Sequence, residues 1–179
     1  APGQTGELAI DMENSPLYFF QGYTWDEKRP YHGKYYLTGD VVISNGDGSH
    51  AYTGRDDDII ASAGYRIGPA EVESSLLEHE AVIESGVVGK PDAKRSAIVK
   101  AYVVLAGGST GDDALVEALQ QHVRSRLSTH SYPREIEFVD ALPKTSSGKI
   151  QRFVLRQRAE QEATQRLMAQ SACCPGVSK

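Results

Sequence analysis

The pattern of the sequence changes near residue 57, and this change constrains the fold more than any other feature. Residues 7 to about 54 hold short apolar runs divided by turn residues, a pattern typical of a strand-rich meander. From about residue 58 onward, helical and strand patterns alternate. We therefore predict an α+β fold, with a strand-rich first region and a small α/β lobe whose short sheets are flanked by helices.

The first region predicts strands joined by tight turns. Asn45-Gly46-Asp47-Gly48 is a strong hairpin signal because glycine adopts positive φ readily, and Thr38-Gly39-Asp40 is a second expected turn. The expected strands are Glu7–Ile10, Leu17–Phe20, Tyr35–Leu37, Val41–Ile43 and His50–Thr53. A meander this small cannot bury both of its faces, so we expect it to belong to a larger sheet.

The second region predicts helices and strands in alternation. Pro69 suits the first turn of a helix over Ala70–His79, and Asp112 or Asp113 caps a second helix. The other expected elements are the strands Ala81–Val88, Ile98–Leu105 and Glu135–Val139, a turn at Gly89-Lys90-Pro91-Asp92, and a polar helix over Phe153–Met168. We expect domains at 1–57 and 58–157, then a polar helix and a disordered tail over 158–179.

Composition excludes several classes of protein. With 40% apolar and 24% charged residues the chain can build a core, and its net charge of −5 argues against a general nucleic-acid surface. No apolar run in these residues reaches membrane-spanning length, and none follows a basic segment as in a secretory leader, so we expect neither feature. Cys173 and Cys174 are adjacent, which suits a disulfide poorly, and no His or Cys cluster has metal-ligand spacing. We expect a reducing, intracellular setting and no metal site.

The first residues suggest a fragment. Ala1-Pro2-Gly3-Gln4-Thr5-Gly6 has no initiator Met and leads directly from turn residues into an apolar run. We therefore expect the chain to be part of a longer protein.

Three motifs carry a family resemblance. They are Tyr36-Leu37-Thr38-Gly39-Asp40, the segment from Gly54 to Glu73, and Pro143-Lys144-Thr145-Ser146-Ser147-Gly148-Lys149-Ile150-Gln151-Arg152. In this order they resemble the C-terminal signatures of the AMP-forming acyl-CoA synthetases, within the adenylate-forming superfamily, and most closely the medium-chain branch. The resemblance implies that residues 1–57 end a large AMP-binding domain and that residues 58–157 form its smaller C-terminal lobe.

The resemblance implies a two-step reaction. A carboxylic acid, expected to be a medium-chain fatty acid, attacks the α-phosphate of ATP, and the thiol of CoA then attacks the acyl-adenylate and releases AMP. Lys149 resembles the catalytic lysine of the first step, where an ammonium group would neutralise the charge that develops on phosphate and carboxylate. Taken alone, Lys149 in a polar Ser-Gly loop would be read as an ordinary solvent-exposed lysine, because polar loops of this kind are common.

The resemblance also assigns nucleotide and hinge residues. Asp40 would accept the ribose hydroxyls of AMP, and Arg55 would hold its ribose or phosphate. From the residues alone, Asp40 could instead cap its own turn, and Arg55 could pair with the acidic run that follows it. Asp57 matches the hinge at which the lobe pivots between the two half-reactions, although a solvated acidic residue fits the local sequence equally well.

A third set of residues is assigned to CoA. Ala63, Gly64 and Tyr65 match the loop that lines the pantetheine channel, where a glycine allows a thin ligand to approach closely. The remaining candidates are Arg95, Arg124, Tyr132, Pro133 and Arg134, since arginine suits bidentate contacts to phosphate. Each of these arginines could also be an ordinary solvated side chain.

The remaining parts of such an enzyme are expected before Ala1. They include the triphosphate loop, the acyl pocket and most ligands of the Mg²⁺ that accompanies ATP. The expected partners are therefore ATP or AMP, CoA, a carboxylic acid and the missing N-terminal domain, without nucleic acid or a membrane span. The expected location is the cytoplasm, or the mitochondrial matrix for a eukaryotic source.

Two other functions are compatible with the motifs. A peptide-synthetase-type adenylation fragment would deliver its acyl group to a separate carrier protein, because no carrier attachment site follows Lys149. A non-catalytic interaction module would retain the fold without the chemistry.

The isolated 179-residue chain should fold at least over residues 58–157 but form no acyl-CoA, because the acyl pocket is expected before Ala1. Far-UV circular dichroism and an acyl-CoA formation assay on the purified chain measure both properties. Steady acyl-CoA production by the isolated chain would contradict this prediction.

Overall fold

The computed structural model describes residues 2–15 and 31–172. It divides the chain into two compact units, Ala1–Asp57 and Asp58–Lys179. The expected strand at Leu17–Phe20 and the tail at 173–179 lie outside the described residues. The α+β class predicted from the sequence is confirmed: strands make up the described part of the first unit, and the second unit combines strands with helices.

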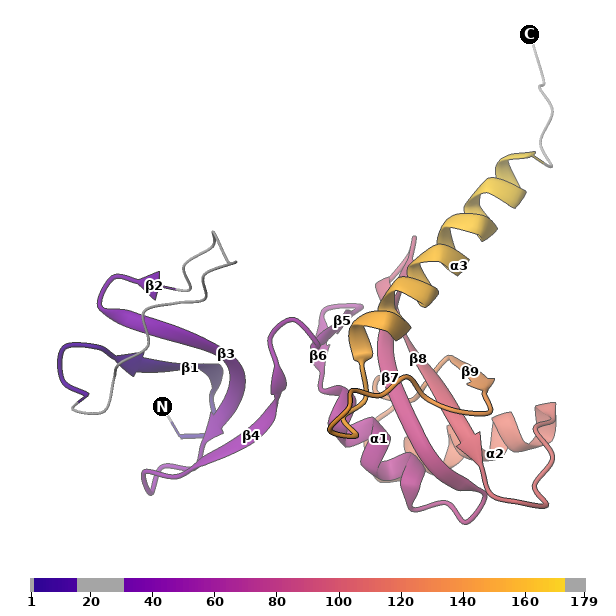
Figure 1. The fold of residues 1–179 in the computed structure, drawn as a ribbon, viewed down its shortest axis with the longest axis horizontal. Coiled ribbons are helices and arrows are strands. Elements are labelled where there is room, and N and C mark those ends of the chain that lie inside the picture. Colours follow the sequence, from indigo (N-terminus) through magenta and orange to yellow (C-terminus); the bar gives the residue numbers. More distant parts are fainter. Residues whose placement is uncertain (1, 16–30, 173–179) are drawn as a thin grey trace, which may run out of the picture. The chain divides into compact units, whose positions relative to one another are not determined.

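The first unit is an antiparallel sheet arranged around one long strand (Figure 1). Its strands are β1 (Thr5–Asp11), β2 (Tyr31–His32), β3 (Tyr35–Ser44) and β4 (His50–Arg55). β1, β2 and β4 all pair with β3. The predicted hairpin turn between β3 and β4 is confirmed, because Gly46 and Gly48 have positive φ and the Asn45 N–H donates to the Ser49 carbonyl at 3.1 Å.

The turn expected at Thr38-Gly39-Asp40 is wrong, because β3 continues through it. Gly39 has a φ of +76°, which by itself would favour a turn. The neighbouring strand β1 keeps the segment in the sheet: Thr38 Oγ1 donates to the Leu8 carbonyl at 2.9 Å, and Glu7 Oε1 accepts the Gly39 N–H at 3.0 Å. These partners lie about 30 residues away, so local sequence cannot reveal them.

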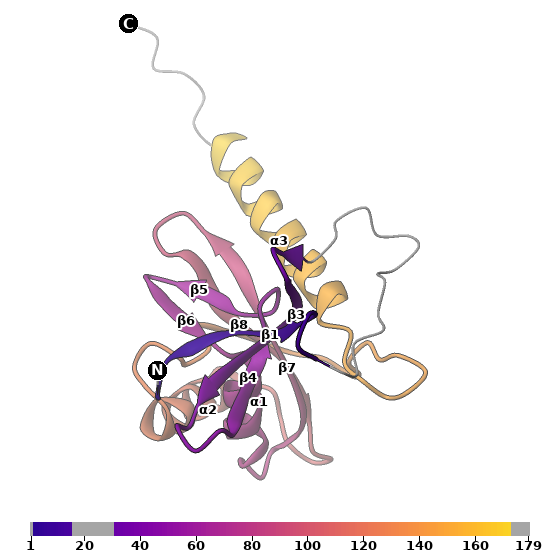
Figure 2. The same cartoon turned by 90° about the vertical axis from the view of Figure 1, so that its left-hand side faces the viewer.

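The second unit contains a five-stranded sheet. Its elements are β5 (Ile60–Ser62), β6 (Tyr65–Ile67), α1 (Pro69–Leu77), β7 (Val82–Asp92), β8 (Ser96–Leu105), α2 (Asp113–Arg126), β9 (Glu135–Phe138) and α3 (Arg152–Ala172). β5 and β6 form a hairpin beside β8 (Figure 2). β7 pairs antiparallel with β8, and β9 adds to β8 in parallel.

Helices cover both faces of this sheet (Figure 1). Alternate residues of β8 point to opposite faces. Val99, Ala101 and Val103 pack with side chains of α1 and α2, whereas Tyr102 packs with Leu155 and Ala159 of α3. Both expected helix starts are confirmed: Pro69 opens α1, and the Asp112 side chain caps α2 by accepting the Leu115 N–H.

The turn expected at Gly89-Lys90-Pro91-Asp92 is also wrong, since β7 runs through it to Asp92. β7 lies at an edge of the sheet, where the missing N–H of a proline removes no ladder hydrogen bond. Within this stretch Gly89 faces Val99, and Lys90 faces Ile98 across the ladder. Glycine and proline signalled a turn locally, but strand pairing decided the outcome.

A charged network joins α3 to the sheet. Lys90 and Lys100 are only 2% and 3% exposed, and Glu162 of α3 accepts hydrogen bonds from both ammonium groups. Glu135 and Glu137 of β9 add a carboxylate to Lys90 and Lys100 respectively. A buried charge without a partner costs free energy, so these carboxylates are required to compensate the charges of the two buried lysines.

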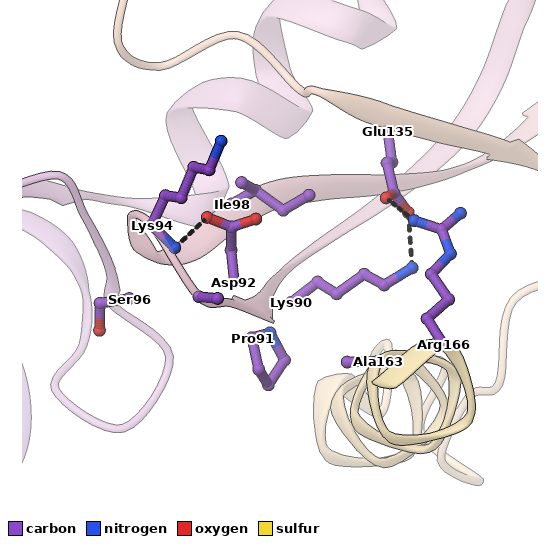
Figure 3. A pocket seen from close by; sticks show the side chains of 10 residues that line it. Lys90, Pro91, Asp92, Lys94, Ser96, Ile98, Glu135, Ala163 and Arg166 are labelled. Atoms are coloured by element: carbon purple, nitrogen blue, oxygen red, sulfur yellow. Dashed lines mark hydrogen bonds and ion pairs between the residues drawn. The ribbon is translucent and has the colours of Figure 1, made fainter. Parts of the chain in front are cut away.

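The network continues along α3 and borders a cavity (Figure 3). Arg166 pairs with Glu135 at 2.7 Å, and Arg158 pairs with Glu137. Beside Lys90 and Arg166 lies a cavity of about 590 Å³, lined also by Pro91, Asp92, Ala93, Lys94, Ser96, Ile98, Glu135 and Ala163. α3 continues without a break past residue 157, and the polar half of this helix packs on the sheet.

None of the described helices combines the length and apolarity required to cross a membrane.

The pKa values of the network reflect this pairing. Burial alone would raise the pKa of Glu162, but hydrogen bonds from Lys100 and Lys90 outweigh burial and lower it. Burial is likewise overcome at Glu135, whose pKa is lowered by hydrogen bonds from Lys90 and Arg166. Both carboxylates therefore stabilise the fold above their unfolded pKa, near 4.5, and lose that contribution as the pH falls through the lowered folded value.

Glu162→Gln should lower the free energy of unfolding by about 3 kcal/mol at pH 7, because two buried ammonium groups lose a shared carboxylate. Urea unfolding followed at 222 nm measures this change. Glu160→Gln is the control, since Glu160 is exposed on the same helix and should change stability by less than about 0.5 kcal/mol. The difference in free energy of unfolding between Glu162→Gln and the unmodified chain should decrease as the pH falls below 4.5. A constant difference down to low pH would contradict the ionic account.

Candidate functional site

The first unit brings Asp40, Arg55 and Asp57 together. Asp40 and Arg55 face each other across β3 and β4. Arg55 Nη1 lies 3.6 Å from Asp40 Oδ1, and its Nε lies 3.2 Å from Asp57 Oδ1. The side chains of Arg55, Asp40 and Asp57 are 50%, 36% and 62% exposed respectively. Because they are so exposed, their ion pairs add little stability. Their charges remain accessible to a ligand.

Gly39 allows this arrangement. A Cβ at this position would lie 2.7 Å from Arg55 Nη2, and the φ of +76° disfavours any other residue. The carboxylate of Asp40 therefore pairs with the guanidinium of Arg55. Asp57 is the last residue of the first unit, and Asp58 is the first residue of the second. The expected hinge position thus coincides with the boundary between the two units.

Lys149 lies on a braced loop of the second unit, defined here as the lysine loop, residues 143–151. Lys144 and Ile150 form an antiparallel bridge, and the Gln151 N–H donates to the Pro143 carbonyl at 2.8 Å. Inside the loop, Thr145 Oγ1 accepts the Lys149 N–H at 3.1 Å. The Lys149 side chain is exposed, and within residues 2–15 and 31–172 no side chain pairs with its Nζ. The backbone is thus held while the ammonium group stays available.

Two ion pairs fasten the base of the lysine loop. Lys144 Nζ lies 2.5 Å from Glu84 of β7. Arg152 follows the loop and makes a bidentate pair with Glu73 of α1, whose carboxylate also accepts the Val87 N–H at 2.9 Å. A planar guanidinium holds a carboxylate in one orientation, so this pair fixes direction as well as distance.

Most of the residues assigned to CoA meet on three neighbouring loops. We define the three-loop surface as residues 62–65, 92–96 and 127–134. The Ala63 N–H donates to the Arg95 carbonyl at 2.9 Å, and Ser62 pairs with Ser96. The Tyr65 ring stacks on His130 with centroids 3.8 Å apart. These contacts connect all three loops.

The backbone of this surface is strained. Ala63 and Ser96 have φ values of +50° and +67°, and they are the non-glycine residues with positive φ in the described part of the chain. Ala63 and Gly64 together form a two-residue hairpin turn in which both φ angles are positive. Strained backbone often accompanies binding sites, where surrounding contacts maintain it.

Tyr132 organises two of the candidate arginines. The guanidinium carbons of Arg124 and Arg134 lie 4.8 Å and 5.0 Å from the centre of its ring. Cation–π contacts therefore hold two positive charges at one aromatic side chain, an arrangement that complements a phosphate group. Pro133 is fully buried, so its ring packs inside the second unit beneath this loop.

Other features clarify what the described residues can bind. No group of three or more His, Cys, Asp or Glu side chains gathers in a way that could hold a metal ion within residues 2–15 and 31–172. The cavity beside Lys90 is lined in part by residues 92–94 and Ser96 of the three-loop surface, but by none of the residues that the sequence assigned to CoA, the nucleotide or the hinge.

Sequence reasoning missed three contributors, His130, Glu73 and Arg152. The stacking of His130 on Tyr65 joins residues 65 positions apart, which no local pattern reveals. Glu73 did carry a signal, because it follows the buried Val72 on a helix and shares the face of Leu76. Arg152 ended the third motif, but its partners come from tertiary packing.

Comparison with known proteins fits these features. Residues 71–149 match the model of the AMP-binding enzyme C-terminal domain. The predicted resemblance to AMP-forming acyl-CoA synthetases is confirmed, because the relatives of the chain are named as acyl-CoA ligases and synthetases.

Three relatives illustrate the match. The mitochondrial acyl-coenzyme A synthetase ACSM4 of Homo sapiens is 46% identical over 161 residues, which cover 87% of this chain and 28% of that protein. The crystal structure of Brucella canis acyl-CoA synthetase is 54% identical, with a TM-score of 0.58 over 89% of this chain and 29% of that one. The anthranilate CoA ligase AuaEII, in complex with anthranoyl-AMP, has a TM-score of 0.75 and 34% identity over 92% of this chain and 32% of that one. The chain spans about three tenths of the length of the curated relatives it matches.

Gly64→Ala should lower the free energy of unfolding of the second unit by about 1 kcal/mol, because alanine is strained at a φ of +87° even where space is open. Urea unfolding followed at 222 nm suits this test, since every helix in the described part of the chain lies in that unit. Gly107→Ala is the control: it has no positive φ and no neighbour within 4 Å, and it should change stability by less than about 0.5 kcal/mol. Equal effects of both variants would contradict the strain argument.

Proposed function

We propose that this chain is the C-terminal part of an acid–thiol ligase. The enzyme joins a carboxylic acid to AMP, using ATP with Mg²⁺, and then transfers the acyl group to CoA. The observation that carries this proposal is the braced lysine loop, which holds an exposed ammonium group at the position that matches the catalytic lysine of the family.

Each group of candidate residues has a role in this reaction. Asp40 and Arg55 bind the ribose and phosphate of the nucleotide, because they offer an accessible carboxylate and guanidinium on adjacent strands. Lys149 neutralises the negative charge that builds up as the carboxylate oxygen attacks the α-phosphate and pyrophosphate leaves. Asp57, at the boundary of the units, is the pivot that exchanges the lysine loop for the three-loop surface at the reaction centre.

The three-loop surface binds CoA in the second step. The turn at Ala63 and Gly64 lines the path of the pantetheine arm, since no atom lies within 4 Å of the open side of Gly64. Arg95, Arg124 and Arg134 meet the phosphates of CoA, and Tyr132 keeps the latter two in place. The thiol then attacks the acyl carbon, and AMP is released.

The substrate and location complete the proposal. We propose a medium-chain fatty acid as the acid, because the motif residues resemble that branch most closely. We also propose that residues 1–57 end an AMP-binding domain and that the protein works in the cytoplasm, or in the mitochondrial matrix of a eukaryote. Pyrophosphate release measured across a panel of carboxylic acids, with the enzyme from the complete reading frame, identifies the acid.

Lys149→Ala in that complete enzyme should slow acyl-adenylate formation at least about 100-fold, because a charge-stabilising donor of the first transition state is lost. Thioester formation from supplied acyl-adenylate should stay near the unmodified rate. Pyrophosphate release and CoA-thioester formation measure the two half-reactions separately. Lys34→Ala is the control, since Lys34 pairs with Asp11 in the other unit and is not part of the candidate site.

The same assays separate the competing functions. Unchanged adenylation by the Lys149→Ala enzyme would indicate a non-catalytic module. Transfer to a holo-carrier protein in preference to CoA would indicate a peptide-synthetase-type enzyme.

A further inference from the structure

Arg152 connects the lysine loop to the first residue of the second unit. It directly follows the loop and opens α3. Its Nε and Nη2 donate to the two carboxylate oxygens of Glu73 at 3.1 Å and 2.6 Å, while its Nη1 lies 3.6 Å from Asp58 Oδ2. The side chains of Glu73 and Asp58 are only 10% and 14% exposed. One guanidinium therefore ties two largely buried carboxylates to the end of the loop.

Arg156 completes this cluster from one helical turn further along α3. Its Nη1 lies 2.5 Å from Asp58 Oδ1, so the Asp58 carboxylate meets two arginines that are four residues apart. We call the set Asp58, Glu73, Arg152 and Arg156 the hinge clamp. Its two positive and two negative charges balance, and removing one partner would leave a poorly solvated charge.

The lysine loop is packed as well as paired. Ile150 packs against the buried side chains between the sheet and α3, which include Leu142 and Leu155. The loop therefore has little freedom to move relative to α3, and the hinge clamp gives α3 little freedom relative to Asp58. Asp58 directly follows Asp57, the proposed pivot.

We propose that the hinge clamp makes the lysine loop rotate as one body with Asp58, so that a change of backbone angle at Asp57 is converted into a defined displacement of Lys149. Arg152 acts in this device as a positioning residue, since it holds the loop and carries out no chemistry itself. The inference rests on the proposed function, in which the second unit pivots at Asp57 between two half-reactions.

The device predicts which half-reaction depends on it. Adenylation needs Lys149 in register with the reacting atoms, and a misplacement of about 1 Å can cost roughly 100-fold in rate. Thioester formation uses the three-loop surface instead, and none of the clamp residues belongs to that surface. A loosened clamp should therefore slow the first half-reaction selectively.

Arg152→Lys in the complete enzyme tests this inference. Lysine keeps the charge but cannot form the bidentate pair with Glu73 or reach Asp58 at the same time. We expect kcat for acyl-adenylate formation to fall about 10- to 100-fold with little change in KM for ATP, whereas thioester formation from supplied acyl-adenylate changes less than about threefold. Asp58→Asn should show the same selectivity, and the double variant should lose less than the product of the two single effects.

Arg126→Lys serves as the matched control, because Arg126 pairs with Glu78 away from the lysine loop and is half exposed. Circular dichroism and thermal melting report whether each variant is folded. If Arg152→Lys does not fold, Asp58→Asn is used for the test. Equal losses in both half-reactions, or no loss in either, would overturn the inference while leaving the proposed function intact. An unmodified enzyme that forms no acyl-adenylate from any acid would instead overturn the proposed function.

Discussion

Charge compensation between the sheet and α3 is the interaction on which the second unit depends. α3 buries few apolar side chains, namely Leu155 and Ala159 among those described, so hydrophobic packing alone holds it weakly. Its acidic and basic residues meet partners that are themselves buried: Glu162 meets Lys90 and Lys100, and Arg152 meets Glu73. A buried charge without its partner would destabilise the fold, so the sheet depends on α3 for charge compensation and α3 depends on the sheet.

This interaction has a geometric consequence for the candidate site. The lysine loop leads into α3, so the placement of α3 on the sheet also places Lys149. Both ends of the loop are fastened, by Lys144 to β7 and by Arg152 to α1, while the Lys149 side chain stays in solvent. A rigid scaffold that presents the Lys149 ammonium group to solvent is a suitable arrangement for stabilising charge in a transition state, since little reorganisation is needed when the charge develops.

The candidate residues divide between two kinds of local structure. Asp40 and Arg55 project from paired strands, whose register sets their separation. The residues of the three-loop surface lie on turns with positive φ, held by contacts between loops such as the Ala63–Arg95 hydrogen bond and the Tyr65–His130 stack. Strands provide a fixed distance, whereas loops provide a surface that a long ligand can follow. We propose that the two arrangements bind a nucleotide and a flexible thiol cofactor respectively.

Periodicity and caps along the sequence determined α1, α2 and the hairpin at Asn45–Gly48, because these depend on contacts within a few residues. The motifs likewise predicted the resemblance to acyl-CoA synthetases and indicated Lys149 as a candidate residue. Only the tertiary structure decided that Thr38–Asp40 and Gly89–Asp92 are strands, that Lys90 and Lys100 are buried, and that Arg152 reaches Asp58. Thr38–Asp40, the two lysines and Arg152 have deciding partners far away in the sequence, whereas Gly89–Asp92 pair with residues 96–99 of the adjacent strand β8. A buried charge or a strained backbone is tolerated only where such a partner compensates for it.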